Sequence, residues 1–435
     1  MKAKTLYSLI AAALIALIAA WWVSSAQKPA SETAGNPSQL LPGFREQIND
    51  VDTITLSGAE SKILATLKRG STGWTIAEKS GYPADLTKLR EFLLKLADAA
   101  VLEQKTANPK LYATLGVTDV KEKEAAGVLV VLVGQKLPVR LVIGNFNGGG
   151  GGGTFVRRDG EAQALLVKGN LSVEKTAAGW EKKDLADIAA ARLKQIILTG
   201  TDGKVLKVYK DQAGDANFKV ADVPKGREVS SDFVANALGS MLAGLRADDV
   251  FAAKDMAPAE KVYKAKYLAF DGLNVDAVGW VKDGKDYAQF SATLDDAAAA
   301  ASIDAEQARA KAEYEAGKKD ATPKAAEKTD AADKKPDGAT ADAKPASIEP
   351  PAPLAVTDPA KDKAERLKTL HDEVAALNKT FSGWTFVLPA YKFGNIDKGM
   401  DDMLKPLESK TGKPAAGKPA TAKPPANPAP AAAQP

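Results

Sequence analysis

The stretch Val128–Val133 reads Val-Leu-Val-Val-Leu-Val, and Val139–Ile143 follows it with Val-Arg-Leu-Val-Ile. Short runs of aliphatic and β-branched residues separated by a turn are typical of paired strands. Thr154–Val156 and Ala164–Val167 continue the series, and glycine-rich or Asp-Gly segments separate several of these runs. The pattern therefore predicts an antiparallel strand meander.

Three shorter strands and one helix are expected before this meander. Thr53–Leu56 alternates polar and apolar residues as a half-buried strand does, and Ile63–Leu67 and Gly73–Ile76 follow it. Asp85 suits the N-cap position of a helix. The apolar residues after it recur on one helical face: Leu86, Leu89, Phe92, Leu93 and Leu96. One apolar face predicts that this helix packs on a sheet.

The same succession of segments begins again near residue 193. The second set of strand-like runs comprises Gln195–Leu198, Val205–Val208, Phe218–Val220, Tyr267–Phe270, Asp276–Trp280 and Tyr287–Phe290. Ser230 takes the place of Asp85, and Gly383-Trp384 loosely matches Gly179-Trp180. We therefore predict the α+β class, with two tandem repeats of a strand meander plus one packed helix at residues 51–192 and 193–405. Two copies indicate an internal duplication rather than a solenoid.

An insertion interrupts the second copy at about residues 297–363, where Ala, Lys, Asp, Glu and Pro dominate and the charges nearly balance. We expect a helix to about Gly317, a disordered proline-containing remainder, and a second helix over residues 361–379. Residues 406–435 form a Lys/Pro/Ala-rich tail that is expected to be disordered.

The N-terminus carries a long apolar run. Residues 6–23 contain no charged side chain and follow Lys2 and Lys4. As a helix this run would span roughly 27 Å, close to the thickness of a bilayer's hydrocarbon core. The preceding lysines predict a cytoplasmic N-terminus. We expect a cytoplasmic tip and transmembrane anchor at residues 1–23 and a linker at 24–50. The bulk of the chain would then be periplasmic, held at the inner membrane by one span.

The alternative for the N-terminus is a cleavable signal peptide. Ser24-Ser25-Ala26 would serve as its cleavage site. The apolar run is longer than a typical signal-peptide core of about 7–15 residues, so a retained signal anchor is favoured.

The composition excludes several classes of site. The 435 residues include no cysteine and one histidine, His371, and the formal net charge is +4. Without cysteine there is no disulfide, thiolate metal site or cysteine nucleophile, and one histidine cannot form a multi-histidine zinc site. His371 lies among charged residues and is interpreted as a surface helix residue rather than a catalytic base. The dispersed charge gives no support for nucleic-acid binding.

Several segments have a composition that could suggest a binding site. The six glycines at 148–153 lack the Gly-Lys-Ser/Thr sequence of a phosphate loop and predict a mobile loop between strands, with a ligand-contacting loop as the alternative. The acidic pairs Asp248-Asp249 and Asp401-Asp402 lack EF-hand spacing and are explained by helix capping and solubility. We expect no catalytic residue, no cofactor and no metal.

Charged residues beside turns suggest an interaction surface. Arg157 and Arg158 precede an Asp-Gly turn, and Arg227 lies in a Lys-Gly-Arg-Glu segment. These three arginines are our candidates for binding an anionic envelope polymer or a partner protein. Solvated turn residues are the simpler alternative, since exposed ion pairs are common on protein surfaces.

An ordered set of motifs is similar to a known family. These motifs are Gly73-Trp74, Tyr82–Asp85, Asn108–Tyr112, Leu115–Val117, Ile143-Gly144, Thr154–Arg157 and Trp180. Together they resemble the domain-of-unknown-function family 4340 over about residues 56–250. The resemblance implies one N-terminal membrane segment, an extracytoplasmic α+β repeat, and an accessory role beside gliding-type ABC transporter components. It implies no catalytic residues.

These observations favour a non-catalytic, membrane-anchored protein whose extracytoplasmic repeats bind protein partners in the cell envelope. ABC transporter subunits are the partners that the resemblance implies. One alternative is a cell-envelope polysaccharide-binding protein. Another is a hydrolase with an unrecognised carboxylate pair, which would require two acids facing across a cleft and a raised pKa on one of them.

Overall fold

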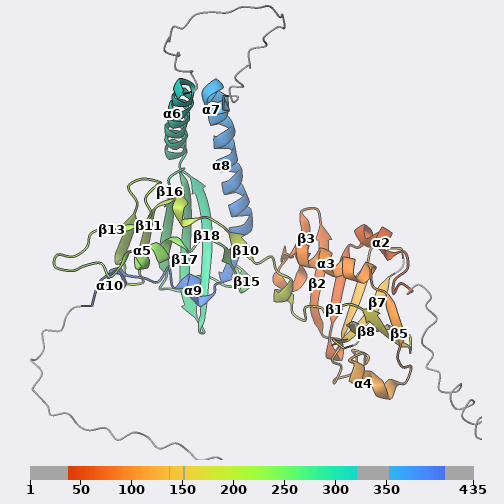
Figure 1. Cartoon of the computed structure of the whole chain (residues 1–435). Coiled ribbons are helices and arrows are strands. Elements are labelled where there is room, and N and C mark those ends of the chain that lie inside the picture. Colours follow the sequence, from red (N-terminus) through yellow and green to blue (C-terminus); the bar gives the residue numbers. More distant parts are fainter. Residues whose placement is uncertain (1–37, 137, 150–151, 321–351, 407–435) are drawn as a thin grey trace, which may run out of the picture.

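The computed structural model describes residues 38–136, 138–149, 152–320 and 352–406 (Figure 1). The predicted anchor at 1–23, the linker up to residue 37, the remainder of the insertion at 321–351 and the tail from 407 lie outside the described residues. Within the described ranges, no helix is both long and apolar enough to cross a bilayer.

The first half of the described chain forms a nine-stranded sheet in the order β4-β3-β2-β1-β6-β7-β8-β9-β5. Neighbouring strands pair antiparallel throughout. The strands are β1 (Thr53–Ser57), β2 (Ile63–Gly70), β3 (Gly73–Ile76), β4 (Tyr82–Pro83), β5 (Val101–Gln104), β6 (Val128–Val133), β7 (Val139–Asn147), β8 (Gly153–Arg158) and β9 (Ala164–Lys168). The predicted opening strands and the predicted meander are confirmed.

Helix α3 (Leu86–Ala97) packs against this sheet. It begins after Asp85, whose Oδ1 accepts hydrogen bonds from the backbone N–H groups of Thr87 and Lys88 at 2.9 and 3.0 Å. These bonds satisfy donors that have no partner inside the helix. Its buried face consists of Leu89, Phe92, Leu93, Leu96 and Ala97. The predicted cap is confirmed, and so is the apolar face except at Leu86, which is 42% exposed.

The segment before β1 belongs to the same folded unit. It contains α2 (Phe44–Gln47) and the short helix η1 (Ile48–Asp50). Leu40 is 0% exposed and Phe44 is 4% exposed, and both pack in the core beneath α3. The expectation of a linker extending to residue 50 is therefore wrong for the described part of that range, because apolar side chains in it are buried.

A strap crosses the sheet and packs on it through a second, smaller cluster of buried residues. The strap contains η4 (Pro109–Leu111) and α4 (Tyr112–Leu115), and Tyr112, Val117 and Val120 pack with strand residues there. The backbones approach so closely that a Cβ atom at Gly144 would lie 2.4 Å from the carbonyl oxygen of Leu115. Gly116 ends α4 at φ 71°, a conformation that favours glycine. These motif glycines therefore serve close backbone packing.

The second half forms an eight-stranded sheet within the described residues, in the order β13-β12-β11-β16-β17-β18-β19-β15. The strands are β11 (Leu193–Thr199), β12 (Val205–Tyr209), β13 (Lys219–Val220), β15 (Asp249–Ala252), β16 (Tyr263–Ala269), β17 (Leu273–Lys282), β18 (Lys285–Leu294) and β19 (Trp384–Val387). The first sheet has the same order of equivalent strands, since β3-β2-β1-β6-β7-β8-β9-β5 corresponds strand by strand to the order of the second sheet. Strand β4 is an additional edge strand of the first sheet. The mixed helix and antiparallel sheet content confirms the α+β class.

The second sheet differs from the sequence-based alignment of the halves in two places. Ser231 occupies the N-cap position of helix α5 (Asp232–Gly239) and makes no side-chain capping hydrogen bond, so Ser230 does not take the role of Asp85. Trp384 begins β19, which holds the position of β9 in the strand order, so the match of Gly383-Trp384 to Gly179-Trp180 is wrong. The insertion separates β18 from β19, and this distance along the chain concealed the correspondence.

The insertion replaces the tight turn that joins β8 to β9 in the first sheet. Its described elements are α6 (Asp296–Asp320), α7 (Leu354–Thr357) and α8 (Pro359–Phe381). The two predicted helices are confirmed, with somewhat different ends. Figure 1 shows α6 and α8 side by side and projecting from the second sheet. We call these three helices the helical arm.

The base of the helical arm is fixed to the sheet by polar contacts. Asn378 of α8 bonds to both the N–H and the C=O of Ala292 on β18, at 2.9 and 2.7 Å. Arg192 reaches both carboxylate oxygens of Glu373 at 2.6 and 2.7 Å and Asp271 at 2.5 Å. The bonds to Glu373 and Asp271 raise the pKa of Arg192. A bidentate arginine pair fixes orientation as well as distance.

We predict that Gly144→Ala lowers the free energy of unfolding by about 1–3 kcal/mol, because the new methyl group meets backbone atoms that cannot rotate away. Urea unfolding of the two proteins measures this difference. Gly148→Ala is the matched control, since the nearest atom to its Cβ is a Phe146 side-chain carbon at 3.7 Å. Equal loss in both variants would contradict the proposed role of close packing at Gly144.

Candidate functional site

The two sheets meet at a junction where side chains from one half enter the core of the other. Tyr82 of β4 packs edge-on against Trp384 and Phe386, with ring centroids 4.9 and 6.5 Å apart. Its hydroxyl donates a hydrogen bond to the carbonyl of Lys182 at 2.9 Å. The first sheet is thus joined to the second by a buried aromatic contact.

The structure also moves the boundary between the halves. Strand β10 (Asp184–Ala186) pairs with β14 (Leu245–Arg246), and Leu185 and Ile188 pack in the core of the second half. The expected boundary at residue 192 is therefore about ten residues too late along the chain. We define the first lobe as residues 38–182 and the second lobe as residues 183–406.

A buried ionic cluster lies at this junction. Lys79, at the end of η3 (Ala77–Lys79), places its Nζ 2.8 Å from Oε1 of Glu181. The same ammonium group forms an ion pair with Asp249 of β15 and donates to the carbonyl oxygen of Val250 at 3.3 Å. The side chains of Lys79, Glu181 and Asp249 are 15%, 0% and 26% exposed. Lys79 and Glu181 belong to the first lobe and Asp249 to the second, so the pair between Lys79 and Asp249 joins the lobes.

The environment separates the pKa values of the two acids. Burial raises the pKa of Glu181 from its ordinary value of 4.5 to about 7, although Lys79 acts in the opposite direction. Burial also disfavours the charged form of Asp249, but the hydrogen bond and charge of Lys79 outweigh it and lower the pKa of Asp249. Below about pH 7, Glu181 is protonated while Asp249 stays ionised and pairs with Lys79. The cluster is then electrically neutral.

This carboxyl pair does not form a cleft of the kind that the hydrolase alternative requires. The Glu181 side chain has no solvent exposure, and its Oε2 has no hydrogen-bond partner among the described residues. A substrate atom could reach it only if the lobes separated. Within the described ranges, no group of three or more His, Asp or Glu side chains could hold a metal ion. The geometry is that of a buried ionic contact that joins the two lobes.

Comparison with protein families gives a match that covers the ionic cluster and Tyr82 but not Trp384 or Phe386. Residues 74–262 match the family model described as domain of unknown function (DUF4340). This part of the chain is similar to that family. The resemblance inferred from the motifs is confirmed over these residues, which include Lys79, Glu181 and Asp249. Comparison with curated proteins and with solved structures gives no match.

The motifs that carried the resemblance have structural roles in the matched region. Tyr82 joins the lobes, Asp85 caps α3, and Trp180 is 1% exposed and packs edge-on against Phe92 at 5.7 Å. The ionic cluster itself was missed by sequence reasoning. The available signals were Glu181, which directly follows the motif tryptophan, and Asp249, which was interpreted as part of a solvated acidic pair.

Arg157, one of the predicted surface residues, is buried within the first lobe. It is 6% exposed, and its Nε and Nη1 donate to the carbonyl oxygens of Val117 and Glu161 at 2.9 and 3.0 Å. Its guanidinium lies 5.0 Å from the ring centroid of Tyr112. The expectation that Arg157 is exposed is therefore wrong, because this arginine of β8 is buried by its contacts with Val117 and Tyr112 of the strap.

The other two predicted arginines lie in different lobes. Arg158 of β8 donates to the carbonyl of Leu40 at 2.8 Å, and its Nη1 lies 3.4 Å from Glu161. Arg227 donates to the carbonyl of Lys405 at 3.0 Å and lies 3.7 Å from Asp401. The structure does not bring Arg157, Arg158 and Arg227 together into one surface.

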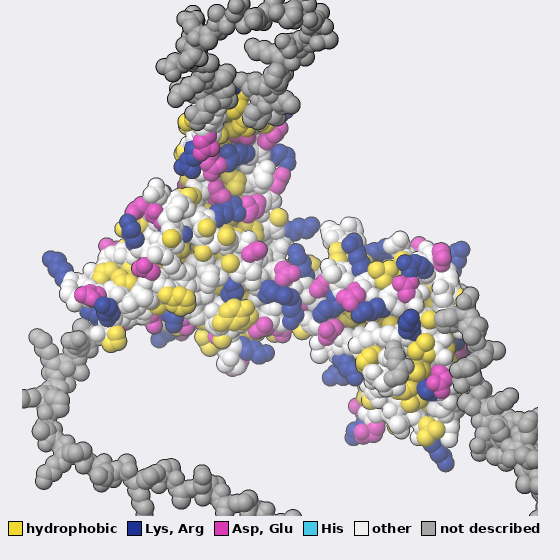
Figure 2. Space-filling view, in the orientation of Figure 1, with side chains coloured by type: hydrophobic (Ala, Val, Ile, Leu, Met, Phe, Trp, Pro, Cys, Tyr) yellow, Lys and Arg dark blue, Asp and Glu magenta, His cyan; other side chains and the backbone are white. Residues whose placement is uncertain are grey.

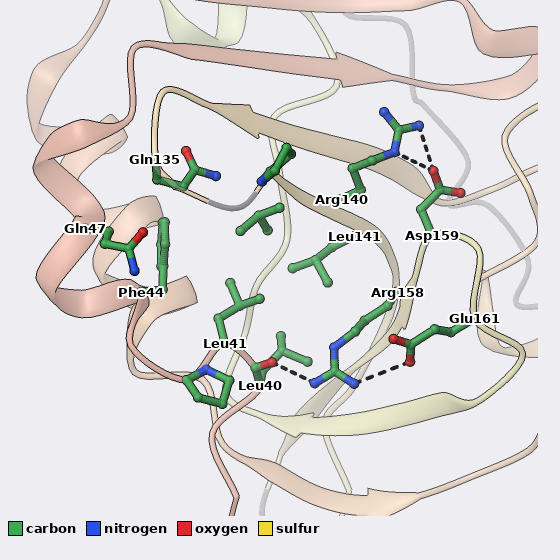
Figure 3. A pocket seen from close by; sticks show the side chains of 13 residues that line it. Leu40, Leu41, Phe44, Gln47, Gln135, Arg140, Leu141, Arg158, Asp159 and Glu161 are labelled. Atoms are coloured by element: carbon green, nitrogen blue, oxygen red, sulfur yellow. Dashed lines mark hydrogen bonds and ion pairs between the residues drawn. The ribbon is translucent and has the colours of Figure 1, made fainter.

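Arg158 also borders a pocket of about 390 Å³ in the first lobe (Figure 3). Leu40, Leu41, Phe44 and Leu141 contribute apolar side chains to its lining. The two arginines that line it are already paired with acids. Arg140 bonds to Asp159 at 2.7 Å, while Arg158 approaches Glu161 as described above. This pocket therefore offers little uncompensated positive charge to an anionic ligand.

Two other predicted features are located by the structure. The glycine run lies between β7 and β8, which confirms a loop between strands, and residues 150–151 of that run lie outside the described residues. His371 is on α8 with a side chain that is 55% exposed, and its Nε2 is 2.9 Å from Asp296. The interpretation of His371 as a surface helix residue is confirmed.

The pKa of Glu181 predicts a specific pH dependence of stability. Because this pKa is higher in the folded protein than its ordinary value, the folded state holds a proton that the unfolded state releases between about pH 4.5 and pH 7. This contribution to stability is present below pH 4.5 and is lost as the pH rises through 7.

We predict that Glu181→Gln removes this loss, so that the variant gains on the order of 3 kcal/mol relative to the wild type between about pH 5 and pH 8. Urea unfolding at several pH values measures the difference. Glu174→Gln is the control, because the Glu174 side chain is 48% exposed. Parallel pH profiles for wild type and Glu181→Gln would contradict the assigned protonation of Glu181.

Proposed function

We propose that this protein is a non-catalytic, membrane-anchored component of the cell envelope whose two lobes bind a partner protein, most directly an ABC-type transport complex. The observation that carries the proposal is the closed junction. Glu181 and Asp249 both lie within ion-pair distance of Lys79 at the contact between the lobes. The Glu181 side chain has no solvent exposure and is therefore inaccessible to a substrate.

The junction supports a binding role because it holds two surfaces in one arrangement. Separation of the lobes would break the ion pair and hydrogen bonds that Lys79 makes with Asp249 and Val250, and these directional contacts favour one arrangement of the lobes. Burial of Tyr82 in the second core adds an apolar contribution to the same contact. A partner could therefore contact both lobes without ordering them first, which lowers the entropic cost of binding.

The helical arm also supports a partner-binding role. The 25 residues of α6 correspond to about 37 Å of helix. Its two long helices are joined by Lys363–Asp304 at 2.7 Å and by an ion pair between Arg366 and Glu306. Figure 2 shows basic and acidic side chains interspersed along the arm. Its ion pairs and charged surface make the arm suited to reaching a protein partner, while its base remains bound to the second sheet.

The membrane part of the proposal rests on the sequence. Residues 1–23 have the length and flanking charge of a single span with a cytoplasmic N-terminus. Residues 24–37, even fully extended, reach at most about 50 Å. The first lobe would then stay close to the membrane surface, where a transport complex is accessible to it. The resemblance to proteins that accompany gliding-type ABC transporter components supports this choice of partner.

Crosslinking in intact cells, followed by purification of the tagged protein and mass spectrometry, tests the proposal. We expect the wild type to recover transporter membrane and ATPase subunits, and recovery to fall by about tenfold when residues 310–358 are replaced by a short Gly/Ser linker. That variant keeps the base of the arm, including the contact of Gln307 with Asp362. A variant lacking residues 409–435 is the control. Recovery of the tagged protein alone from wild-type cells would contradict the proposal.

A further inference from the structure

The first lobe has a groove of about 390 Å³ that the junction does not use. It is formed by residues of η1, of the β2–β3 hairpin and of α3, with Trp74 and leucines of α3 in its lining. This volume lies within the range of about 300–1,000 Å³ that is usual for ligand pockets. The groove is separate from the pocket bordered by Arg158, since the two share no lining residue.

The groove exposes apolar side chains of α3 beside an arginine. Leu86, Arg90 and Leu94 follow one another at intervals of four residues and therefore lie along one stripe of the helix. Leu86 is 42% exposed and Leu94 is 45% exposed, while the opposite face of α3 is buried in the core. These two leucines contribute little to the core, so their exposure in a groove indicates a contact surface.

The charges around the groove are uncompensated. Arg69 donates to the carbonyl of Asn49 at 2.5 Å and lies 5.8 Å from the ring centroid of Trp74. In the part of the chain that the structure describes, neither Arg69 nor Arg90 has a carboxylate partner, and no acidic residue lines the groove. The neighbouring pocket differs, because Arg140 and Arg158 there are paired with Asp159 and Glu161.

This combination matches the composition of protein-binding surfaces. The core of a protein interface is enriched in tryptophan and arginine and depleted in lysine, aspartate and glutamate. The groove presents Trp74 and two arginines among leucines, with no lysine or acid in its lining. Trp74 and Arg69 already contact each other, so part of the surface is ordered before a ligand arrives.

We propose that this groove binds a peptide segment of the partner protein in which apolar side chains are flanked by carboxylates. The apolar side chains would contact Trp74, Leu86 and Leu94, and the carboxylates would pair with Arg69 and Arg90. This inference rests on the proposed function, because it identifies the chemistry of the partner that the two lobes bind. A polysaccharide fits less well, since it has no aliphatic side chain to place on the exposed leucines.

Selection from a random peptide library displayed on phage tests this proposal with the full-length protein as the immobilised target. We expect the enriched peptides to combine Leu, Ile or Phe with Asp or Glu, and to contain few Lys or Arg. The affinity of a selected peptide, measured by fluorescence anisotropy, should fall by about tenfold in both Arg90→Glu and Arg69→Glu. Lys123→Glu, a charge reversal at an exposed lysine outside the groove, should leave the affinity within about twofold.

Several outcomes would overturn the proposal. Enrichment of basic peptides, no enrichment, or equal binding to wild type and Arg90→Glu would each do so. Competition by vesicles of phosphatidylglycerol, but not by any peptide, would assign the groove to an anionic membrane instead. Arg90→Gln removes the charge and keeps a polar side chain at an exposed position. Loss of peptide binding in this variant, with unchanged circular dichroism and thermal unfolding, would show that the loss does not come from unfolding.

The cell-based crosslinking separates this inference from the function on which it rests. If Arg90→Glu recovers the same partners as the wild type, the groove is not their binding site, although the interaction role stands. If the wild type recovers no partner, the interaction role itself fails. Loss of partners in Arg90→Glu with retention in Lys123→Glu supports both.

Discussion

The arrangement of the molecule depends on one ammonium group that contacts two carboxyl groups. Lys79 of the first lobe pairs with Asp249 of the second and lies within ion-pair distance of Glu181, which is fully buried between them. Burial keeps Glu181 protonated up to about pH 7, so the cluster avoids an uncompensated buried charge. The packing of Tyr82 against Trp384 and Phe386 is formed at the same junction. The charged cluster, which could suggest a catalytic site, thus forms part of the contact between the two lobes.

The sheets of the two lobes share one strand order but differ in what connects two of their strands. In the first sheet a short turn joins β8 to β9, whereas the corresponding position in the second sheet carries the helical arm. A turn between strands tolerates such an insertion because the flanking strands keep their hydrogen bonds. Arg192 fixes the arm through Glu373 and Asp271. The first lobe instead has an open groove beside α3, so the two lobes present different surfaces.

Much of the fold could be predicted because it follows from local patterns. Alternating polar and apolar residues predicted strands such as β1, and Asp85 followed by an apolar helical face predicted α3. The failures involve contacts between distant residues. Arg157 stands beside an Asp-Gly turn, yet the strap around Tyr112 buries it. The ionic cluster draws its members from three separated segments, and no spacing in the sequence brings them together. The candidate site therefore became visible only in three dimensions.

The most direct test of this account is the distribution of distances between the lobes. The chain has no cysteine, so spin labels at Lys123→Cys and Lys282→Cys, both exposed lysines, report one distance by pulsed electron paramagnetic resonance. The account predicts a narrow distribution in the otherwise native chain and a broad one when Lys79→Ala is added. A broad distribution with Lys79 in place, or an unchanged one without it, would contradict the claim that this cluster holds the lobes together.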